Sequence, residues 1–133
     1  HKAEAEFLKE LSASDIIKAE SGDKIDVGGV EIQLLHTPGH TPGSQCFLVD
    51  NRIVSGDTLF IGSCGRIDLP GSNPEQMYYS LTQKLMALPD ETILFPGHNY
   101  SDRPTSTIGA EKQTNPYFHF HSLKQFLAAM GYR

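Results

Sequence analysis

The chain has 133 residues, a hydrophobic fraction of 38% and a formal net charge of −5. The acidic charge excludes a nucleic-acid-binding face, which would have to be basic, and no run of about 18 apolar residues is present to span a membrane. With only Cys46 and Cys64, we expect no disulfide framework but two reduced thiols in a cytoplasmic protein, a single disulfide between them being the alternative.

The first half of the chain predicts a helix followed by strands. Residues 2–11 carry apolar side chains at helical spacing. Residues 24–35 alternate apolar and polar side chains around a central Gly28-Gly29, which is the pattern of a β-hairpin. A loop rich in proline and glycine follows, and two short strands are expected at 46–49 and 52–54.

The second half predicts helices around one more strand. Asn73-Pro74 opens a helix, because proline at its first position sacrifices no hydrogen bond. Residues 92–95 form a short apolar strand, and an amphipathic helix is expected from about 122 to 130. Strands and helices therefore alternate, which predicts an α/β fold, with α+β as the alternative arrangement.

Three loops share one design, in which an apolar run ends and a metal-competent side chain follows. The sequence TPGHTPGS holds His40, VSGDTLF holds Asp57, and LFPGHNY holds His98. Loops at strand ends are positioned by a rigid sheet yet can converge. Imidazole and carboxylate together suit zinc, iron or manganese.

Each of these residues also has a plain structural interpretation. A single histidine in a loop is usually a surface residue, and an aspartate after glycine usually forms an Asx-turn or helix cap. The recurrence of three such loops favours the metal interpretation. We therefore expect the three side chains to lie within roughly 7 Å of one another, as two metals about 3.5 Å apart would require.

The sequences TPGHTPGS, GDTLF and PGHNY, in this order, resemble three metal-binding loops of the metallo-β-lactamase superfamily. The resemblance implies that His40 binds a first metal, that Asp57 is the catalytic carboxylate bridging two metals, and that His98 binds the second. It also implies an αββα sandwich, of which this chain would hold the C-terminal half. Two zinc ions are the implied cofactor, with iron as the alternative.

GSCGRIDLPG and STIGAEKQTNP resemble the thiol-handling branch of that superfamily, which includes glyoxalase II and the persulfide dioxygenases. Arg66 is a candidate for binding a substrate carboxylate, because its planar guanidinium matches that group; the alternative is a pair with Asp68 that shapes the loop. Tyr100 is a second substrate-binding candidate, with simple packing as its alternative. His36 is expected to orient the loop that carries His40.

The superfamily's His-x-His-x-Asp-His motif is absent from this sequence. We therefore expect residues 1–133 to form a single partial domain whose N-terminal half is missing, so that the chain is a homo-oligomer or lacks a covering segment. The parent protein is expected to be a metal-dependent hydrolase of a thioester or ester such as a hydroxyacylglutathione. The alternatives are an iron-dependent persulfide dioxygenase and, for the isolated chain, a non-catalytic fragment.

Overall fold

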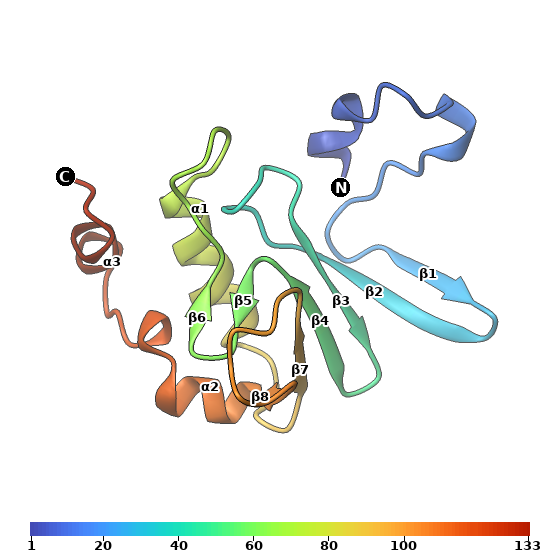
Figure 1. Cartoon of the computed structure of the whole chain (residues 1–133). Coiled ribbons are helices and arrows are strands. Elements are labelled where there is room, and N and C mark those ends of the chain that lie inside the picture. Colours follow the sequence, from blue (N-terminus) through green and yellow to red (C-terminus); the bar gives the residue numbers. More distant parts are fainter.

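The computed structural model describes residues 1–133, which form a six-stranded sheet with helices on one of its faces (Figure 1). The sheet order is β1-β2-β3-β4-β7-β8. Its strands are β1 (Lys24–Val27), β2 (Val30–His36), β3 (Gln45–Val49), β4 (Arg52–Gly56), β7 (Ile93–Pro96) and β8 (Ser106–Thr107). A separate small hairpin is formed by β5 (Leu59–Phe60) and β6 (Ser63–Cys64). The α/β class expected from the sequence is confirmed.

Helical segments lie before the first strand, between β6 and β7, and after β8. The α-helices are α1 (Pro74–Tyr79), α2 (Ile108–Thr114) and α3 (Leu123–Ala129), and α1 continues as the π-helical segment η3 (Ser80–Leu85). The 3-10 segments are η1 (Lys2–Phe7), η2 (Ala13–Asp15) and η4 (Pro116–Phe118). None of these helices is both long enough and apolar enough to cross a membrane. The N-terminal segment and α3 lie at opposite ends of the sheet (Figure 1).

Strand direction explains why the three metal-competent loops meet. β2 and β3 are antiparallel, β3 and β4 are antiparallel, and β4 and β7 are parallel. Strands β2, β4 and β7 therefore run in the same direction, and the loops that follow them leave the same edge of the sheet. Those three loops carry His40, Asp57 and His98.

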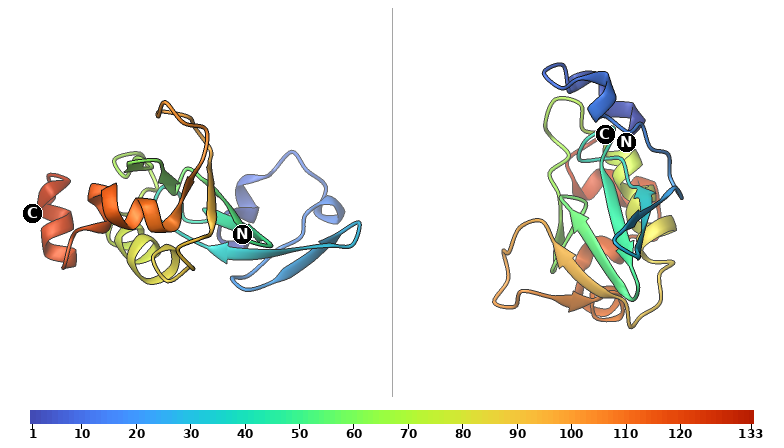
Figure 2. Two further views of the ribbon diagram at one scale, coloured as in Figure 1. Left: turned by 90° about the horizontal axis from the view of Figure 1, so that it is seen from below. Right: turned by 90° about the vertical axis from the view of Figure 1, so that its right-hand side faces the viewer.

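One face of the sheet is covered by the helices. Side chains directly opposite one another on neighbouring strands share a face, so Ile53 and Leu94 point the same way. Both are fully buried and belong to a core that also includes Met77 from α1, Leu85 from η3 and Phe126 from α3. Figure 2 shows this helical layer from two further directions. The core therefore lies between the sheet and its helices.

The opposite face is apolar but largely uncovered. Val54 pairs with Phe47 and with Phe95, so these side chains share that face. Val54 and Phe95 are 42% and 37% exposed, and Val27 at the far end of the sheet is 58% exposed. The apolar residues of the same face, by strand register, are Ile25, Val27, Val30, Ile32, Leu34, Phe47, Val49, Val54, Ile93 and Phe95.

One detail of the sequence-based prediction is wrong, at the N-terminus. Residues 2–11 do not form an α-helix: only η1 is helical, and Leu8 and Leu11 are about half exposed. Short helices depend on packing for stability, and this one buries no residue. The polar residues 106–116 contain the short strand β8 and helix α2, and the Thr107 side chain caps the helix by accepting from the Ala110 N–H.

Candidate metal centre

His40, Asp57 and His98 converge at the edge of the sheet, as the sequence predicted. His40 Nε2 lies 3.5 Å from Asp57 Oδ2, and His98 Nδ1 lies 2.8 Å from Asp57 Oδ1. The two oxygens of one carboxylate thus face two different imidazoles. This is the geometric arrangement expected of a carboxylate placed between two binding positions.

The loop that carries His40 is fixed by hydrogen bonds on several sides. The His40 carbonyl accepts from Ser72 Oγ at 2.7 Å, and the Gly39 carbonyl accepts from the Asn73 N–H at 2.8 Å. Gly39 has a φ of +145°, and a side chain there would lie 2.5 Å from the Met77 backbone, so glycine is required. His36 Nε2 donates to the Pro42 carbonyl at 2.8 Å, which confirms that His36 orients this loop.

The orientation of the His40 ring is set by the backbone of another loop. His40 Nδ1 lies 2.8 Å from the Arg66 carbonyl oxygen, which can only accept. Nδ1 therefore carries the proton, and in the neutral ring the lone pair is on Nε2, the nitrogen that faces Asp57. A histidine held in this tautomer by a carbonyl is ready to bind a metal through its second nitrogen.

Close backbone approach brings the other two loops together. The Gly97 N–H donates to the Gly56 carbonyl at 2.8 Å, and a Cβ at Gly97 would lie 2.8 Å from Asp57 Oδ1. Gly65 packs against the Asp57 backbone, since a Cβ there would lie 1.7 Å from the Asp57 carbonyl oxygen. The glycines therefore leave room for the Asp57 carboxylate between the loops.

His98 is more exposed than His40 and is supported by aromatic rings. Its ring is stacked with that of Tyr100, with centroids 5.5 Å apart, and meets the edge of Phe60 at 5.7 Å. Tyr100 also meets Phe60 edge-on at 5.3 Å, while its side chain is 72% exposed. The packing interpretation of Tyr100 is thus realised, and its role in substrate binding stays a prediction.

The three residues line an open cleft of about 330 Å³, together with Phe60, Ser63, Cys64, Arg66 and Tyr100. Its volume is at the lower end of the range for small-molecule sites. Arg66 forms a bidentate pair with Asp68, with Nε and Nη2 each 2.9 Å from a carboxylate oxygen. This hydrogen bonding raises the pKa of Arg66 and lowers the pKa of Asp68. The loop-shaping pair is present, and substrate binding by Arg66 stays a prediction.

Neither cysteine has the character of a nucleophile. Cys46 and Cys64 are both free thiols, as expected. Burial raises the pKa of Cys64 to about 12 and that of Cys46 to about 11. A thiolate is the reactive form, so both side chains are suited to packing.

The donor set fits part of a two-metal site. Two imidazoles and one carboxylate suit zinc or iron, and the carboxylate lies between the two rings. A catalytic zinc normally takes three protein ligands. No group of three or more histidine, cysteine, aspartate or glutamate side chains here is arranged to hold one ion. His119 Nε2 donates to the Lys112 carbonyl, and His119 belongs to no such group.

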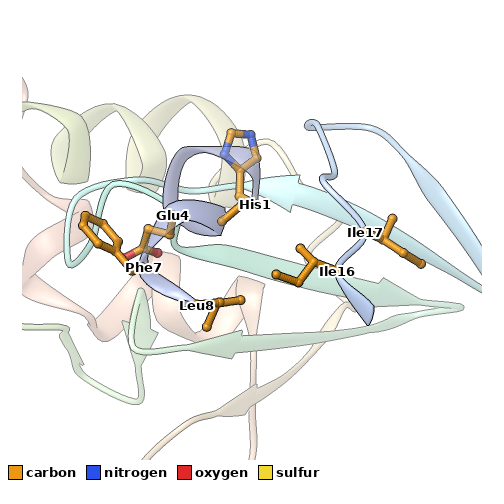
Figure 3. A pocket seen from close by; sticks show the side chains of 7 residues that line it. His1, Glu4, Phe7, Leu8, Ile16 and Ile17 are labelled. Carbon is orange, nitrogen blue, oxygen red and sulfur yellow. The ribbon is translucent and has the colours of Figure 1, made fainter. Parts of the chain in front are cut away.

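A second hollow, of about 310 Å³, lies between η1 and the residues after η2 (Figure 3). Its walls are mainly Phe7, Leu8, Ile16 and Ile17, with His1 and Glu4 as the only ionisable side chains. Glu4 accepts a hydrogen bond from Thr41 Oγ1 at 2.9 Å, so it supports the loop of His40. No set of chemically reactive groups converges there.

Comparison with known proteins finds similarity to one superfamily. The model of the metallo-beta-lactamase superfamily matches residues 3–98. A Bacillus velezensis protein named "Probable polyketide biosynthesis zinc-dependent hydrolase BaeB" is 30% identical over 125 residues, which cover 94% of this chain and 55% of that protein.

Two solved structures superpose on the chain. ETHE1 from Myxococcus xanthus has a TM-score of 0.82 at 39% identity and covers 86% of this chain and 51% of its own. TTHA1623, crystallised in a di-iron-bound form, has a TM-score of 0.65 at 41% identity and covers 77% of this chain and 48% of its own. The chain thus spans about half the length of these relatives.

Proposed function

Because this chain belongs to the metallo-β-lactamase superfamily, we propose that the whole protein is a metal-dependent hydrolase of a thioester or ester. Its substrate is a small thiol-linked molecule such as a hydroxyacylglutathione. The observation that carries the proposal is the Asp57 carboxylate, whose two oxygens face His40 and His98 at 3.5 and 2.8 Å.

The roles of the residues follow from their positions. His40 and Asp57 would hold one metal, and Asp57 and His98 would contribute to a second. Zinc bound at such a site supplies Lewis-acid chemistry, polarising a carbonyl and lowering the pKa of a water to near neutrality. Asp57 keeps the two imidazoles at a fixed separation, and the Arg66 carbonyl keeps His40 in the tautomer that presents Nε2.

The cleft wall provides groups for a small anionic substrate. Asp68 occupies Nε and Nη2 of Arg66, which leaves Nη1 for a carboxylate of the substrate. The Arg66 side chain is 68% exposed and lines the cleft with His40 and His98. Tyr100 and Phe60 offer aromatic surface beside His98. These features support a substrate with a carboxylate attached to a short thiol-linked chain.

Metal content and thioester hydrolysis of the whole protein test the proposal. Asp57→Ala should lose both bound metal and turnover, because it removes the carboxylate common to both positions. Asp102→Ala is the matched control, since this carboxylate is exposed in the loop after β7 and its substitution should change neither. An Asp57→Ala protein that retains metal and hydrolyses thioesters at the original rate would contradict the proposal.

An iron-dependent persulfide dioxygenase is the second candidate. It is favoured by the sequence CGRID at residues 64–68. The similar protein TTHA1623, crystallised in a di-iron-bound form, supports iron as the metal but not the number of ions. In that case His40 and Asp57 would join a further ligand around one iron. Elemental analysis of protein purified without added metal discriminates, because two zinc ions support the hydrolase and one iron the dioxygenase. For the 133-residue chain alone we propose no turnover, since three ligands are shared between two positions.

A further inference from the structure

The C-terminal segment, residues 106–132, contacts a loop of the candidate metal centre through residues that do not line the cleft. We define the site loop as residues 60–67, which comprise part of the hairpin β5–β6 and the residues after it. The C-terminal segment follows the residues matched by the superfamily model, which end at 98. It contacts the site loop through Glu111, Asn115 and Tyr132.

Glu111 is a buried carboxylate that accepts hydrogen bonds from three donors. Its Oε2 accepts from the Gly62 N–H at 2.8 Å and from Asn115 Nδ2 at 2.9 Å, and its Oε1 accepts from Ser106 Oγ at 2.7 Å. Glu111 is only 1% exposed. A buried carboxylate is costly unless such bonds satisfy it, so its presence at this position ties α2 firmly to the site loop.

Asn115 and Tyr132 donate hydrogen bonds to backbone carbonyl groups of the same loop. Asn115 Nδ2 donates to the carbonyls of Phe60 at 3.3 Å and Ser63 at 3.1 Å, and Asn115 is fully buried. The Tyr132 hydroxyl donates to the Ile67 carbonyl at 2.7 Å. The loop is therefore fixed at residues 60, 62 and 63 on one side of Arg66 and at residue 67 on the other.

Arg66 lies between these anchors, and its carbonyl accepts the proton of His40 Nδ1 at 2.8 Å. One residue earlier, Gly65 packs directly on the Asp57 backbone. A shift of the site loop would therefore withdraw the acceptor that determines which nitrogen of His40 is protonated. It would also disturb the carboxylate that His40 faces.

We propose that Glu111, Asn115 and Tyr132 are positioning residues, which hold the Arg66 carbonyl in place and thereby set the tautomer and direction of His40. The consequence for metal binding rests on the proposed function, whereas the consequence for the His40 tautomer does not. None of the three touches the cleft, so their effect is transmitted through the backbone of the site loop.

Nuclear magnetic resonance of the histidine ring nitrogens tests this directly in the metal-free whole protein. The nitrogen chemical shifts distinguish the two neutral tautomers from the doubly protonated ring, so the variants are compared at a pH at which those shifts show a neutral ring. The first variant is Tyr132→Phe, which removes one hydroxyl and leaves the ring. Its matched control is Tyr117→Phe, which removes a hydroxyl from the same segment that bonds to no part of the site loop.

Glu111 provides a second pair of variants. Glu111→Ala removes all three hydrogen bonds. Glu111→Gln should preserve them, because its amide oxygen can accept from Gly62 and Asn115 while the Ser106 hydroxyl turns to accept from the amide nitrogen. A purely electrostatic role of the carboxylate would instead make the glutamine variant resemble the alanine variant.

The wild-type protein should show His40 protonated at Nδ1 alone. Tyr132→Phe and Glu111→Ala should show a mixture of tautomers and bind Co²⁺ about tenfold more weakly, at the lower end of the 10–100-fold effect of groups behind metal ligands. Tyr117→Phe and Glu111→Gln should match wild type in both measurements. An unchanged His40 tautomer in folded Tyr132→Phe would overturn the proposal, and this variant decides the matter if Glu111→Ala does not fold. If wild type binds no Co²⁺, the proposed function fails while the tautomer result still stands.

Discussion

Gly65 offers the sharpest perturbation of the candidate site. Its φ is ordinary, so alanine there has no intrinsic backbone strain, and the whole effect comes from what the new methyl group meets. That group would lie 1.7 Å from the Asp57 carbonyl oxygen and 3.4 Å from His40 Cβ. Gly65→Ala must therefore separate the site loop from the two loops that carry Asp57 and His40.

The structure sets the size of the effect. An ordinary contact between carbon and oxygen is about 3.4 Å, so the backbone must move by more than about 1 Å to relieve the clash. Overpacking typically costs about 1–3 kcal/mol, and because the atom met is backbone we expect about 3 kcal/mol. For a protein of this size the melting temperature should fall by about 10 °C. Co²⁺ affinity should fall by about 10–100-fold, because the Arg66 carbonyl moves with the loop.

Gly28→Ala separates this effect from that of glycine substitution in general. Gly28 has a φ of +62° and no atom within 4 Å of its added Cβ, far along the chain from the site. It should cost about 1–2 kcal/mol through backbone strain and leave Co²⁺ affinity unchanged. Calorimetry and metal titration of both variants give the comparison. Equal metal affinity in Gly65→Ala and wild type would refute the reasoning that the site loop positions the ligands.

Two further predictions concern the cleft. In the two-metal hydrolase, His98→Ala should abolish thioester hydrolysis and remove one of the two bound metals. Retained hydrolysis with a single zinc would contradict that enzyme. In a one-iron dioxygenase the same substitution should largely spare activity. Arg66→Ala should raise KM for an anionic thiol substrate with kcat little changed, and leave the melting temperature within about 2 °C, because exposed ion pairs contribute little to stability. A large loss of thermal stability with unchanged KM would favour the pair with Asp68 as the role of Arg66.

The sequence contained enough information to predict the convergence of His40, Asp57 and His98. Each follows an apolar run closely, and the three preceding strands run in the same direction. Local sequence patterns indicate where each strand ends. Because the ends of parallel strands meet at one edge of the sheet, the three side chains that follow them lie close together.

The residues behind the site could not be predicted in the same way. Glu111 and Asn115 lie in the quoted STIGAEKQTNP sequence, yet their polar surroundings favour a surface segment. Glutamate is seldom fully buried, and its partners at Gly62 and Ser106 are visible only in three dimensions. Tyr132 is 65 positions from the carbonyl it contacts. A buried carboxylate network depends on tertiary contacts, which periodicity does not report.

Because the first sheet of the sandwich is expected to be missing, the sequence predicts an apolar, uncovered sheet face. The residues expected to contribute to it are Ile25, Val27, Leu34, Phe47, Val49, Val54 and Leu94. Ile25, Val27 and Val54 are exposed, as expected. Leu34 lies on this face but is buried, and Leu94 points to the helices because it pairs with Ile53. Six of the seven expected residues thus lie on this face and Leu94 does not, since strand register decides which side each residue occupies.

The free energy gained by burying this face can be compared with the cost of bringing a second molecule to it. The five exposed residues Ile25, Val27, Val30, Val54 and Phe95 are 37–58% exposed, which together equals about two whole side chains. At about 1.5–3 kcal/mol for each buried side chain, covering them stabilises by about 3–7 kcal/mol, and twice that if two copies cover each other. Bringing two molecules together costs about 4–15 kcal/mol. A second copy would therefore bind weakly, whereas a segment of the same chain avoids most of that cost.

We therefore expect the 133-residue chain to self-associate weakly, and a longer form with a preceding segment to cover this face itself. Val54→Lys should abolish self-association of the shorter form, measured by sedimentation over a range of concentrations, because it places a charge at the centre of the face. The same change should destabilise the longer form. Leu69→Lys, at a 37% exposed position outside the sheet, should do neither. A shorter form that stays monomeric at every concentration, or a longer form that tolerates Val54→Lys as well as Leu69→Lys, would show that this face needs no cover.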